Sequence, residues 1–202
     1  MTQHEYEACW TRHAAEIEQI RQEAYQLHDG VGQTYGDGLP YGYHLDMVVA
    51  AIHDYGHLVC QGDADVVPLV FGGYYHDSIE DARLSYNDVM AAACRHLSDD
   101  KALLATEIVY ALTNEKGRTR AERAGDRYYD GIRQTPYAPF VKLCDRLANV
   151  TYSCASGRAD DRMRGVYAQE MPHFLAALKT SAADPRLALP AEVVAKMEEC
   201  LA

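Results

Sequence analysis

Apolar side chains recur every three or four residues along most of the chain, and this spacing predicts helices. The stretch 4–28 shows the spacing without an internal Gly or Pro. The other predicted helical stretches are 44–61, 69–82, 85–97, 99–113, 137–155 and 160–178, with a polar loop and then a helix in 116–134 and a last helix after Pro190. No stretch alternates apolar and polar residues convincingly, as a half-buried strand would. We therefore expect an all-α bundle of about eight or nine helices, forming one domain over 1–202.

Local sequence signals support several of these helices. Ser85 is suited to be an N-cap, and Asp88 stands three residues later as its capping-box partner. The core-facing stripe of the helix in 160–178 consists of Tyr167, Phe174 and Leu178. The stretch 29–43 breaks the pattern, because it holds five glycines and a proline. A loop of this length suggests a functional role.

Composition indicates an ordinary globular protein. The chain has 202 residues, of which 48% are hydrophobic and 24% are charged, which is enough for a real core. No apolar run is long enough for a membrane span, and the polar N-terminus lacks a signal-peptide core, so we expect a cytoplasmic protein. The six scattered cysteines form no C-x-x-C pair and are interpreted as reduced thiols.

The formal net charge of −11 argues against broad, nonspecific binding to nucleic acid, which needs a basic surface. One segment, 114–133, departs from this acidic balance. Its basic residues are Lys116, Arg118, Arg120, Arg123, Arg127 and Arg133, against four acidic ones. Such a segment is either a solvated helix face of mixed charge or a site for an anionic ligand.

Two of the three His-Asp pairs have simple structural interpretations. His28-Asp29 ends a predicted helix, where a histidine favours the helix dipole. His53-Asp54 belongs to an H-x-x-x-H spacing with His57, which could bind zinc on one helix face. The metalloprotease motif carries Glu where Asp54 stands, and no third ligand follows at a known offset. We therefore expect surface or hydrogen-bonded histidines here.

The third pair, His76-Asp77, lies in a denser polar group. Glu80 follows His76 by four residues and Asp81 follows Asp77 by four, so on a helix the four groups occupy adjoining stripes. The residues before them are apolar or small, which predicts burial. Burying four ionisable groups is costly without a cation or arginine partners. A divalent metal is the simpler explanation.

Further ligands would have to come from elsewhere in the chain. His44 begins a predicted helix directly after the glycine-rich loop. Asp145 lies in a largely apolar helix, where it needs a partner. An ion pair with Lys142 or Arg146 in its own helix is the structural alternative for Asp145.

The order His44, His76-Asp77, Asp145 resembles the HD-domain metal-dependent phosphohydrolases. Within them the chain is similar to the hydrolase domain of RelA/SpoT homologues, in the stand-alone form called small alarmone hydrolases. The stretches that carry the resemblance are "YGYHLDMV", "YYHDSIED", "IVYALTNEKGRTRAER" and "VKLCDRLANV", in the family's order. The resemblance covers about residues 20–178 and leaves a C-terminal helical extension.

The resemblance implies a site. His44, His76, Asp77 and Asp145 would hold one divalent cation, usually Mn²⁺ in this family, and the mixed N/O set also suits Fe²⁺ or Zn²⁺. By the same resemblance, Glu80 and Asp81 would orient or deprotonate the attacking water. Asn149, one turn after Asp145, would contact the sugar of a nucleotide. Arg118, Arg120 or Arg123 would neutralise phosphates of that nucleotide.

The implied reaction is hydrolysis of the 3′-pyrophosphate of (p)ppGpp, which gives GDP or GTP and pyrophosphate. The chain departs from the family because its 30–43 loop has no basic residue, so we expect Tyr35, Tyr41 or Tyr43 to stack on the base. Leu45 also replaces a proline that many members carry after the first histidine. Three alternatives stay open: removal of a 3′-pyrophosphate from tRNA by an antitoxin-type enzyme, a general HD-domain nucleotidase, and a noncatalytic nucleotide-binding module.

Overall fold

The fold is all-α, as the spacing of apolar residues predicted. The computed structural model describes residues 1–114, 118–119, 122, 125–155 and 161–202. These residues contain ten α-helices, where the pattern predicted eight or nine, and one small antiparallel sheet. No helix in this part of the chain has both the length and the apolar run that crossing a membrane requires. All six cysteines are free thiols.

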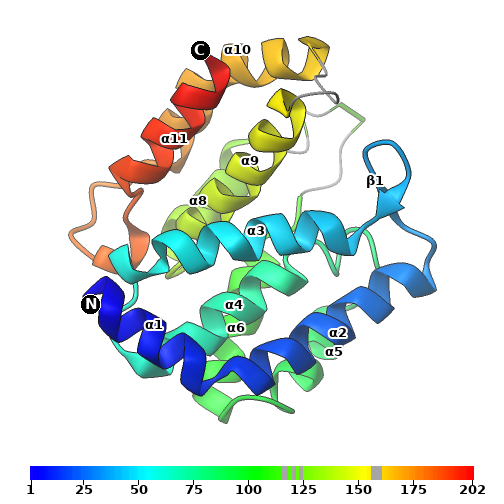
Figure 1. Ribbon diagram of the computed structural model, residues 1–202, viewed down its shortest axis with the longest axis vertical. Helices are drawn as coiled ribbons and strands as arrows, with labels where there is room; N and C mark the ends of the chain where they lie inside the picture. The colour runs from blue at the N-terminus through cyan, green and yellow to red at the C-terminus, as the bar shows by residue number, and fades with distance from the viewer. Residues whose placement is uncertain (115–117, 120–121, 123–124, 156–160) are drawn as a thin grey trace.

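The bounds of the elements follow the chain order (Figure 1). The α-helices are α1 (Gln3–Arg12), α2 (Ala14–Gly30), α3 (Gly42–Tyr55), α4 (Val66–Tyr75), α5 (Tyr86–Ala93), α6 (Asp99–Leu112), α8 (Asp126–Gln134), α9 (Ala138–Cys154), α10 (Asp161–Leu178) and α11 (Ala191–Leu201). Short 3-10 helices are η1 (Gly56–Leu58), η2 (Asp63–Asp65) and η3 (Pro185–Leu187), and the two strands are β1 (Thr34–Tyr35) and β2 (Leu39–Pro40).

Helices α3, α4 and α9 form the centre of the bundle and pack against one another. Helices α2 and α6 also pack on α4, whereas α10 and α11 pack on α9 (Figure 1). Every residue of α4 is buried. Its glycines allow this close packing: a Cβ at Gly72 would lie 2.7 Å from Ile108 of α6, and one at Gly73 would lie 2.5 Å from Ile52 of α3. The end of α4 is therefore held close to both neighbours.

Two predicted helix starts and one predicted buried stripe are confirmed. Ser85 caps α5 and forms a capping box with Asp88. The helix after Pro190 is α11. Tyr167, Phe174 and Leu178 are buried on one side of α10.

The prediction of one helix over 4–28 was wrong, because the chain breaks between α1 and α2 at His13. This break has a tertiary cause that the local sequence does not contain. The His13 ring contacts Asp63 Oδ1 at 3.2 Å, and Arg12 reaches the same oxygen at 2.8 Å. Asp63 lies in η2, fifty residues away along the chain. The contact with η2 therefore turns the chain where propensity alone would continue the helix.

The prediction of a helix over 69–82 was also wrong at its end. Helix α4 stops at Tyr75, and residues 76–80 form a turn instead. His76 Nδ1 lies 2.7 Å from the carbonyl oxygen of Gly73, so the imidazole ties back to the last turn of α4. His76, Asp77, Glu80 and Asp81 thus lie in the turn after the helix, rather than on adjoining helical stripes.

Two further boundaries differ from the prediction. Helix α3 ends at Tyr55 instead of residue 61 and is followed by η1. A Cβ at Gly56 would lie 2.2 Å from the Tyr6 hydroxyl, which donates to the carbonyl of Ile52 at 3.0 Å. In the 29–43 stretch, Thr34 pairs with Pro40 and Tyr35 with Leu39. Two residues per strand are too few for an alternating pattern to be recognised.

Candidate metal centre

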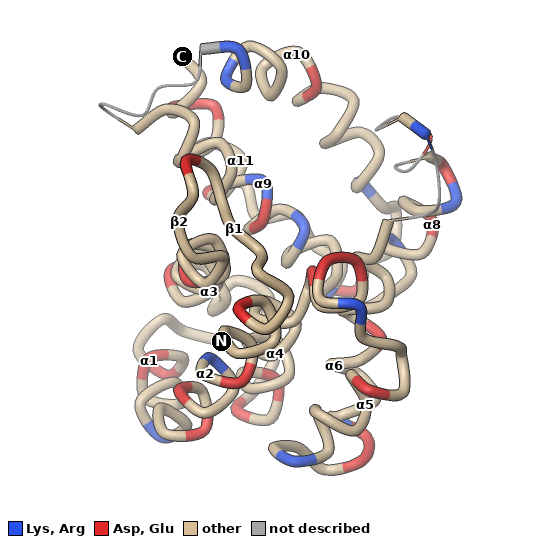
Figure 2. Tube along the Cα trace, turned by 90° about the vertical axis from the view of Figure 1, so that its right-hand side faces the viewer, with Lys and Arg blue, Asp and Glu red and all other residues tan. Residues whose placement is uncertain are grey.

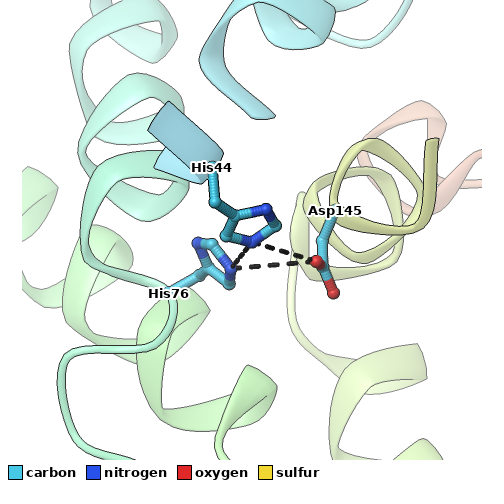
Figure 3. Close-up of side chains that lie close together, drawn as sticks. All are labelled: His44, His76 and Asp145. Atoms are coloured by element: carbon cyan, nitrogen blue, oxygen red, sulfur yellow. Dashed lines mark hydrogen bonds and ion pairs between the residues drawn. The ribbon is translucent and has the colours of Figure 1, made fainter. Parts of the chain in front are cut away.

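His44, His76 and Asp145 converge from three central helices. His44 lies in the first turn of α3, His76 directly follows α4, and Asp145 lies midway along α9. Their ligand atoms all lie within 4.8 Å of one another. The two Nε2 atoms are 3.3 Å apart, and Asp145 Oδ1 lies 3.4 Å from the Nε2 atom of His44 and 3.9 Å from that of His76 (Figure 3). This group could bind a metal ion.

The size of this triangle fits a first-row divalent cation. A point equidistant from three atoms at these separations lies about 2 Å from each, which is the usual length of a bond from such a cation to imidazole nitrogen or carboxylate oxygen. Both imidazoles are buried, and the Asp145 side chain is 13% exposed. Two imidazoles and one or two carboxylates form a donor set that such cations accept.

Asp77 lies beside this triangle rather than within it. Its Oδ2 atom is 2.8 Å from His76 Nε2 and 3.8 Å from His44 Nε2. The Tyr41 hydroxyl donates a hydrogen bond to the same oxygen. Asp77 therefore reaches both imidazoles, and its role as a fourth ligand stays a prediction.

The hydrogen bond at Nδ1 of His76 leaves the Nε2 atom free to bind a metal ion. Its Nδ1 atom is within hydrogen-bond distance of the Gly73 carbonyl, which accepts only from a protonated Nδ1. In the neutral ring the lone pair is then on Nε2, which points to His44 and Asp145. His44 Nδ1 is buried and has no hydrogen-bond partner among the described residues.

The electrostatics of the group favour a positive charge. Burial alone would lower the pKa of His76, but Asp77 and Asp145 outweigh it and raise that pKa to about 9. Burial alone would raise the pKa of Asp77, but His76 outweighs it and holds the value well below the usual range. The cluster thus attracts a proton in the absence of any other cation, and a divalent ion satisfies the same demand.

Asp145 is held from both sides by its own helix. Lys142 Nζ donates to Oδ2 at 2.9 Å, and the Asn149 side-chain amide donates to Oδ1 at 2.7 Å. Burial alone would raise the pKa of Asp145, but Lys142 and the two imidazoles hold it well below its usual value. Of the two alternative partners predicted for Asp145, Lys142 is the real one. Arg146 pairs instead with Glu170 of α10, at 2.8 Å.

Glu80 and Asp81 follow His76 and Asp77 in the turn after α4. Each accepts a hydrogen bond from a side-chain amide that no sequence pattern singles out. Asn114, just after α6, donates to Glu80 Oε1 at 3.0 Å, and Gln33 donates to Asp81 Oδ2 at 2.9 Å. Burial, and then the charges of Asp77 and Glu80, raise the pKa of Asp81 to about 6. No spacing rule connects residues 33 and 114 to this turn.

The three tyrosines predicted to stack on a base lie next to one another beside His44. Tyr41 is 7% exposed, and its ring stacks on His28 at 4.4 Å, so one face of the ring is covered. Tyr35 stacks on His44 at 4.8 Å, and its hydroxyl donates to Asn149 Oδ1 at 3.0 Å. Tyr43 is exposed. These positions leave the choice of a base-stacking tyrosine open.

The basic segment is only partly described. Arg118 is exposed, whereas Lys116, Arg120 and Arg123 lie outside the described residues. Arg127, in the first turn of α8, lines a cavity of about 800 Å³ between α6 and α8 together with Asn114. Asn114 thus connects this cavity to Glu80. Figure 2 shows further basic positions on α9 and α10, interspersed with acidic ones.

The other two His-Asp pairs do not join a metal group. His53 contacts Trp10 edge-on at 4.6 Å and is partly exposed, and neither His53 nor His57 belongs to a cluster of three ligands within the described ranges. His28 lies in the last turn of α2, as predicted, but it is not available to solvent there. His28 is fully buried and stacked on Tyr41, and among the described residues neither ring nitrogen has a hydrogen-bond partner.

We expect His28 to make the fold sensitive to acid. Burial lowers the pKa of His28 to about 4, below its ordinary value of 6.5. Between these values the unfolded chain binds a proton that the folded chain does not. The contribution of neutral His28 to the free energy of unfolding is therefore fully present above pH 6.5, and it is lost as the pH falls towards 4. The contribution lost between pH 7.5 and 5 is about 2 kcal/mol.

The measurement is urea unfolding of the metal-free protein at the two pH values, compared with His28→Phe. Phenylalanine keeps a ring against Tyr41 but cannot be protonated, so the pH-dependent loss of stability should shrink by that amount. An equal loss in both proteins would contradict a neutral, buried His28.

No protein-family model matches the chain, and no curated protein matches it.

Proposed function

We propose that this chain is a metal-dependent phosphohydrolase of the HD-domain type, and that it hydrolyses the 3′-pyrophosphate of (p)ppGpp. The observation that carries the proposal is the convergence of His44, His76 and Asp145 from separate helices, with their ligand atoms within 4.8 Å. The order of these residues along the chain is the one that the resemblance to RelA/SpoT-type hydrolases implies.

His44, His76, Asp77 and Asp145 would hold one cation, and Mn²⁺, Fe²⁺ and Zn²⁺ all suit this donor set. When bound, the cation would act as a Lewis acid towards the phosphoryl oxygens. The protein's own contribution is to keep these four side chains in place. The Gly73 carbonyl orients His76, the Tyr41 hydroxyl holds Asp77, and Asn149 holds Asp145.

Glu80 and Asp81 would handle the proton of the attacking water. Water adds to the phosphorus attached to the 3′ oxygen, the bond between that phosphorus and the 3′ oxygen breaks, and one water proton passes to a carboxylate of the pair. The 3′ oxygen takes up a proton and leaves as the hydroxyl group of GDP or GTP, and pyrophosphate is the other product. Asn114 and Gln33 hold the two carboxylates by separate hydrogen bonds.

The nucleotide would lie between α9 and the cavity beside α8. Asn149 is adjacent to Asp145 on the side where the family contacts the sugar, and Tyr35 packs against both Asn149 and His44. On the other side, Arg127 lines the cavity that Asn114 connects to Glu80. Arg118 and Arg123 would add positive charge for the remaining phosphates.

A product assay tests the proposal. The purified protein is incubated with Mn²⁺ and with ppGpp, tRNA carrying a 3′-pyrophosphate, or a panel of nucleoside monophosphates. Pyrophosphate and GDP from ppGpp are the expected products. Pyrophosphate from the tRNA alone would indicate an RNA substrate, and orthophosphate from monophosphates would indicate a general nucleotidase. Failure to hydrolyse any of the three substrates would refute a phosphohydrolase.

A further inference from the structure

An ammonium group lies directly against the candidate metal centre. Lys142 is one turn before Asp145 on α9, its side chain is 18% exposed, and its Nζ atom lies 2.9 Å from Asp145 Oδ2. The same nitrogen lies 5.8 Å from the centre of the Tyr128 ring, which lines the cavity between α6 and α8. A cation beside a site for another cation opposes binding, so its presence requires a reason.

Orientation of Asp145 does not depend on Lys142 alone. Asn149 donates to Oδ1 from one turn further along α9, and His44 faces the same oxygen. These contacts hold the oxygen that faces the imidazoles, whereas Lys142 bonds the other oxygen. The distinctive contribution of Lys142 is therefore its charge.

The positive charge of Lys142 changes the net charge of the candidate metal centre. Lys142 adds one positive charge to the centre whether the centre is empty or loaded. With a divalent cation bound and both imidazoles neutral, the cation, Asp77, Asp145 and Lys142 together carry one positive charge. Without Lys142 the loaded centre would be neutral, and the empty centre would carry one more negative charge than it does with Lys142. Without Lys142 the two close carboxylates would make the empty site less stable than it is with the lysine. The loaded site without Lys142 would also attract an anionic phosphate less strongly.

We propose that Lys142 is the internal counter-ion of this centre, a positioning residue that stabilises Asp145 before a cation binds, weakens cation binding, and leaves the loaded centre positive for a phosphate anion. The proposal deepens the proposed function and rests on it, since it assigns a charge role at the same centre. It gives Lys142 opposite effects on the two ligands, which a purely structural residue would not have.

The first test is binding of Mn²⁺ alone, followed by the EPR signal of the free ion, in the wild-type protein, Lys142→Met and Lys142→Arg. Lys142→Met should bind Mn²⁺ about tenfold more tightly because an adjacent positive charge is gone. Lys142→Arg should bind as the wild type does. If Lys142→Met does not fold even with Mn²⁺, Lys142→Gln, which keeps a hydrogen-bond donor but no charge, carries the same test.

The second test uses inorganic phosphate as the probe, with each protein saturated with Mn²⁺. Lys142→Met should bind phosphate about tenfold more weakly than the wild type. Phosphate binding that is unchanged, or Mn²⁺ binding that is unchanged or weaker in Lys142→Met, would overturn the proposal. If the wild type itself binds no divalent cation, the proposed function fails. If it binds Mn²⁺ and only the shifts are absent, only the role of Lys142 fails.

Lys101→Met is the matched control. Lys101 Nζ pairs with Asp65 Oδ1 at the same distance, 2.9 Å, in a partly buried position that no predicted ligand contacts. Its loss should lower stability through a broken ion pair and leave the affinities for Mn²⁺ and phosphate unchanged. Equal changes in the two variants would show that both act through stability alone.

Discussion

Asp145→Asn is expected to abolish Mn²⁺ binding and to lower the rate of hydrolysis by at least about 10³-fold, since the several kcal/mol that a catalytic cation supplies is lost with it. Asparagine keeps the size of the side chain but removes the negative charge that faces His44 at 3.4 Å. It also leaves the Lys142 ammonium group beside the imidazoles without its counter-ion. Both changes oppose a cation at the centre.

The measurement pairs Mn²⁺ titration with the rate of pyrophosphate release. Asp65→Asn is the control, because Asp65 forms an ion pair of the same length with Lys101 in another part of the bundle. Both variants should lose stability, and only Asp145→Asn should lose the metal. An Asp145→Asn protein that binds Mn²⁺ with wild-type affinity would remove Asp145 from the ligand set.

The sequence was sufficient to select Asp145 but not to decide between its two interpretations. A carboxylate in an apolar helix needs a partner, and both an ion pair with Lys142 and a metal centre met that need. In the structure Asp145 contacts Lys142 through Oδ2 and faces His44 through Oδ1. An i,i+3 spacing identifies the first contact, whereas the second depends on how α3 and α4 pack against α9, which no local pattern contains.

The turn after α4 shows where helical spacing failed. Residues 69–82 carry a helix-like pattern, but the hydrogen bond between His76 and the Gly73 carbonyl accompanies the end of the helix at Tyr75. The i,i+4 argument therefore assumed a helix at Glu80 and Asp81, where the chain forms a turn. Burial of α4 against α3 and α6, permitted by Gly72 and Gly73, brings His76 to His44.

Residues that act through hydrogen bonds were the least predictable. Gln33 lies in the glycine-rich stretch whose length suggested a function, but nothing there singled out an amide. Asn114 lies two residues after the end of α6, and the sequence pattern marked it only as the beginning of a basic segment. The fold brings Gln33 to Asp81, 48 residues away along the chain, and Asn114 to Glu80, 34 residues away. Such partners are set by tertiary packing, not by periodicity.

Glu80→Gln should separate metal binding from proton transfer. Glu80 is exposed and contacts none of the three clustered ligands in the described structure, and Asn114 donates to both of its carboxylate oxygens. Glutamine keeps the shape but can no longer take a proton, so Mn²⁺ affinity should stay at the wild-type value. The rate of hydrolysis should fall by about 10²-fold or more, the usual contribution of a general base.

The comparison variant is Glu199→Gln, which alters an exposed glutamate that pairs with Lys196 on α11. Its rate should stay within about twofold of the wild type, because surface substitutions away from a site change little. Equal rates for Glu80→Gln and wild type would leave Asp81 as the proton acceptor, and its replacement by Asn should then carry the whole loss. If neither variant slows pyrophosphate release while Mn²⁺ still binds, the acidic pair has no part in the reaction.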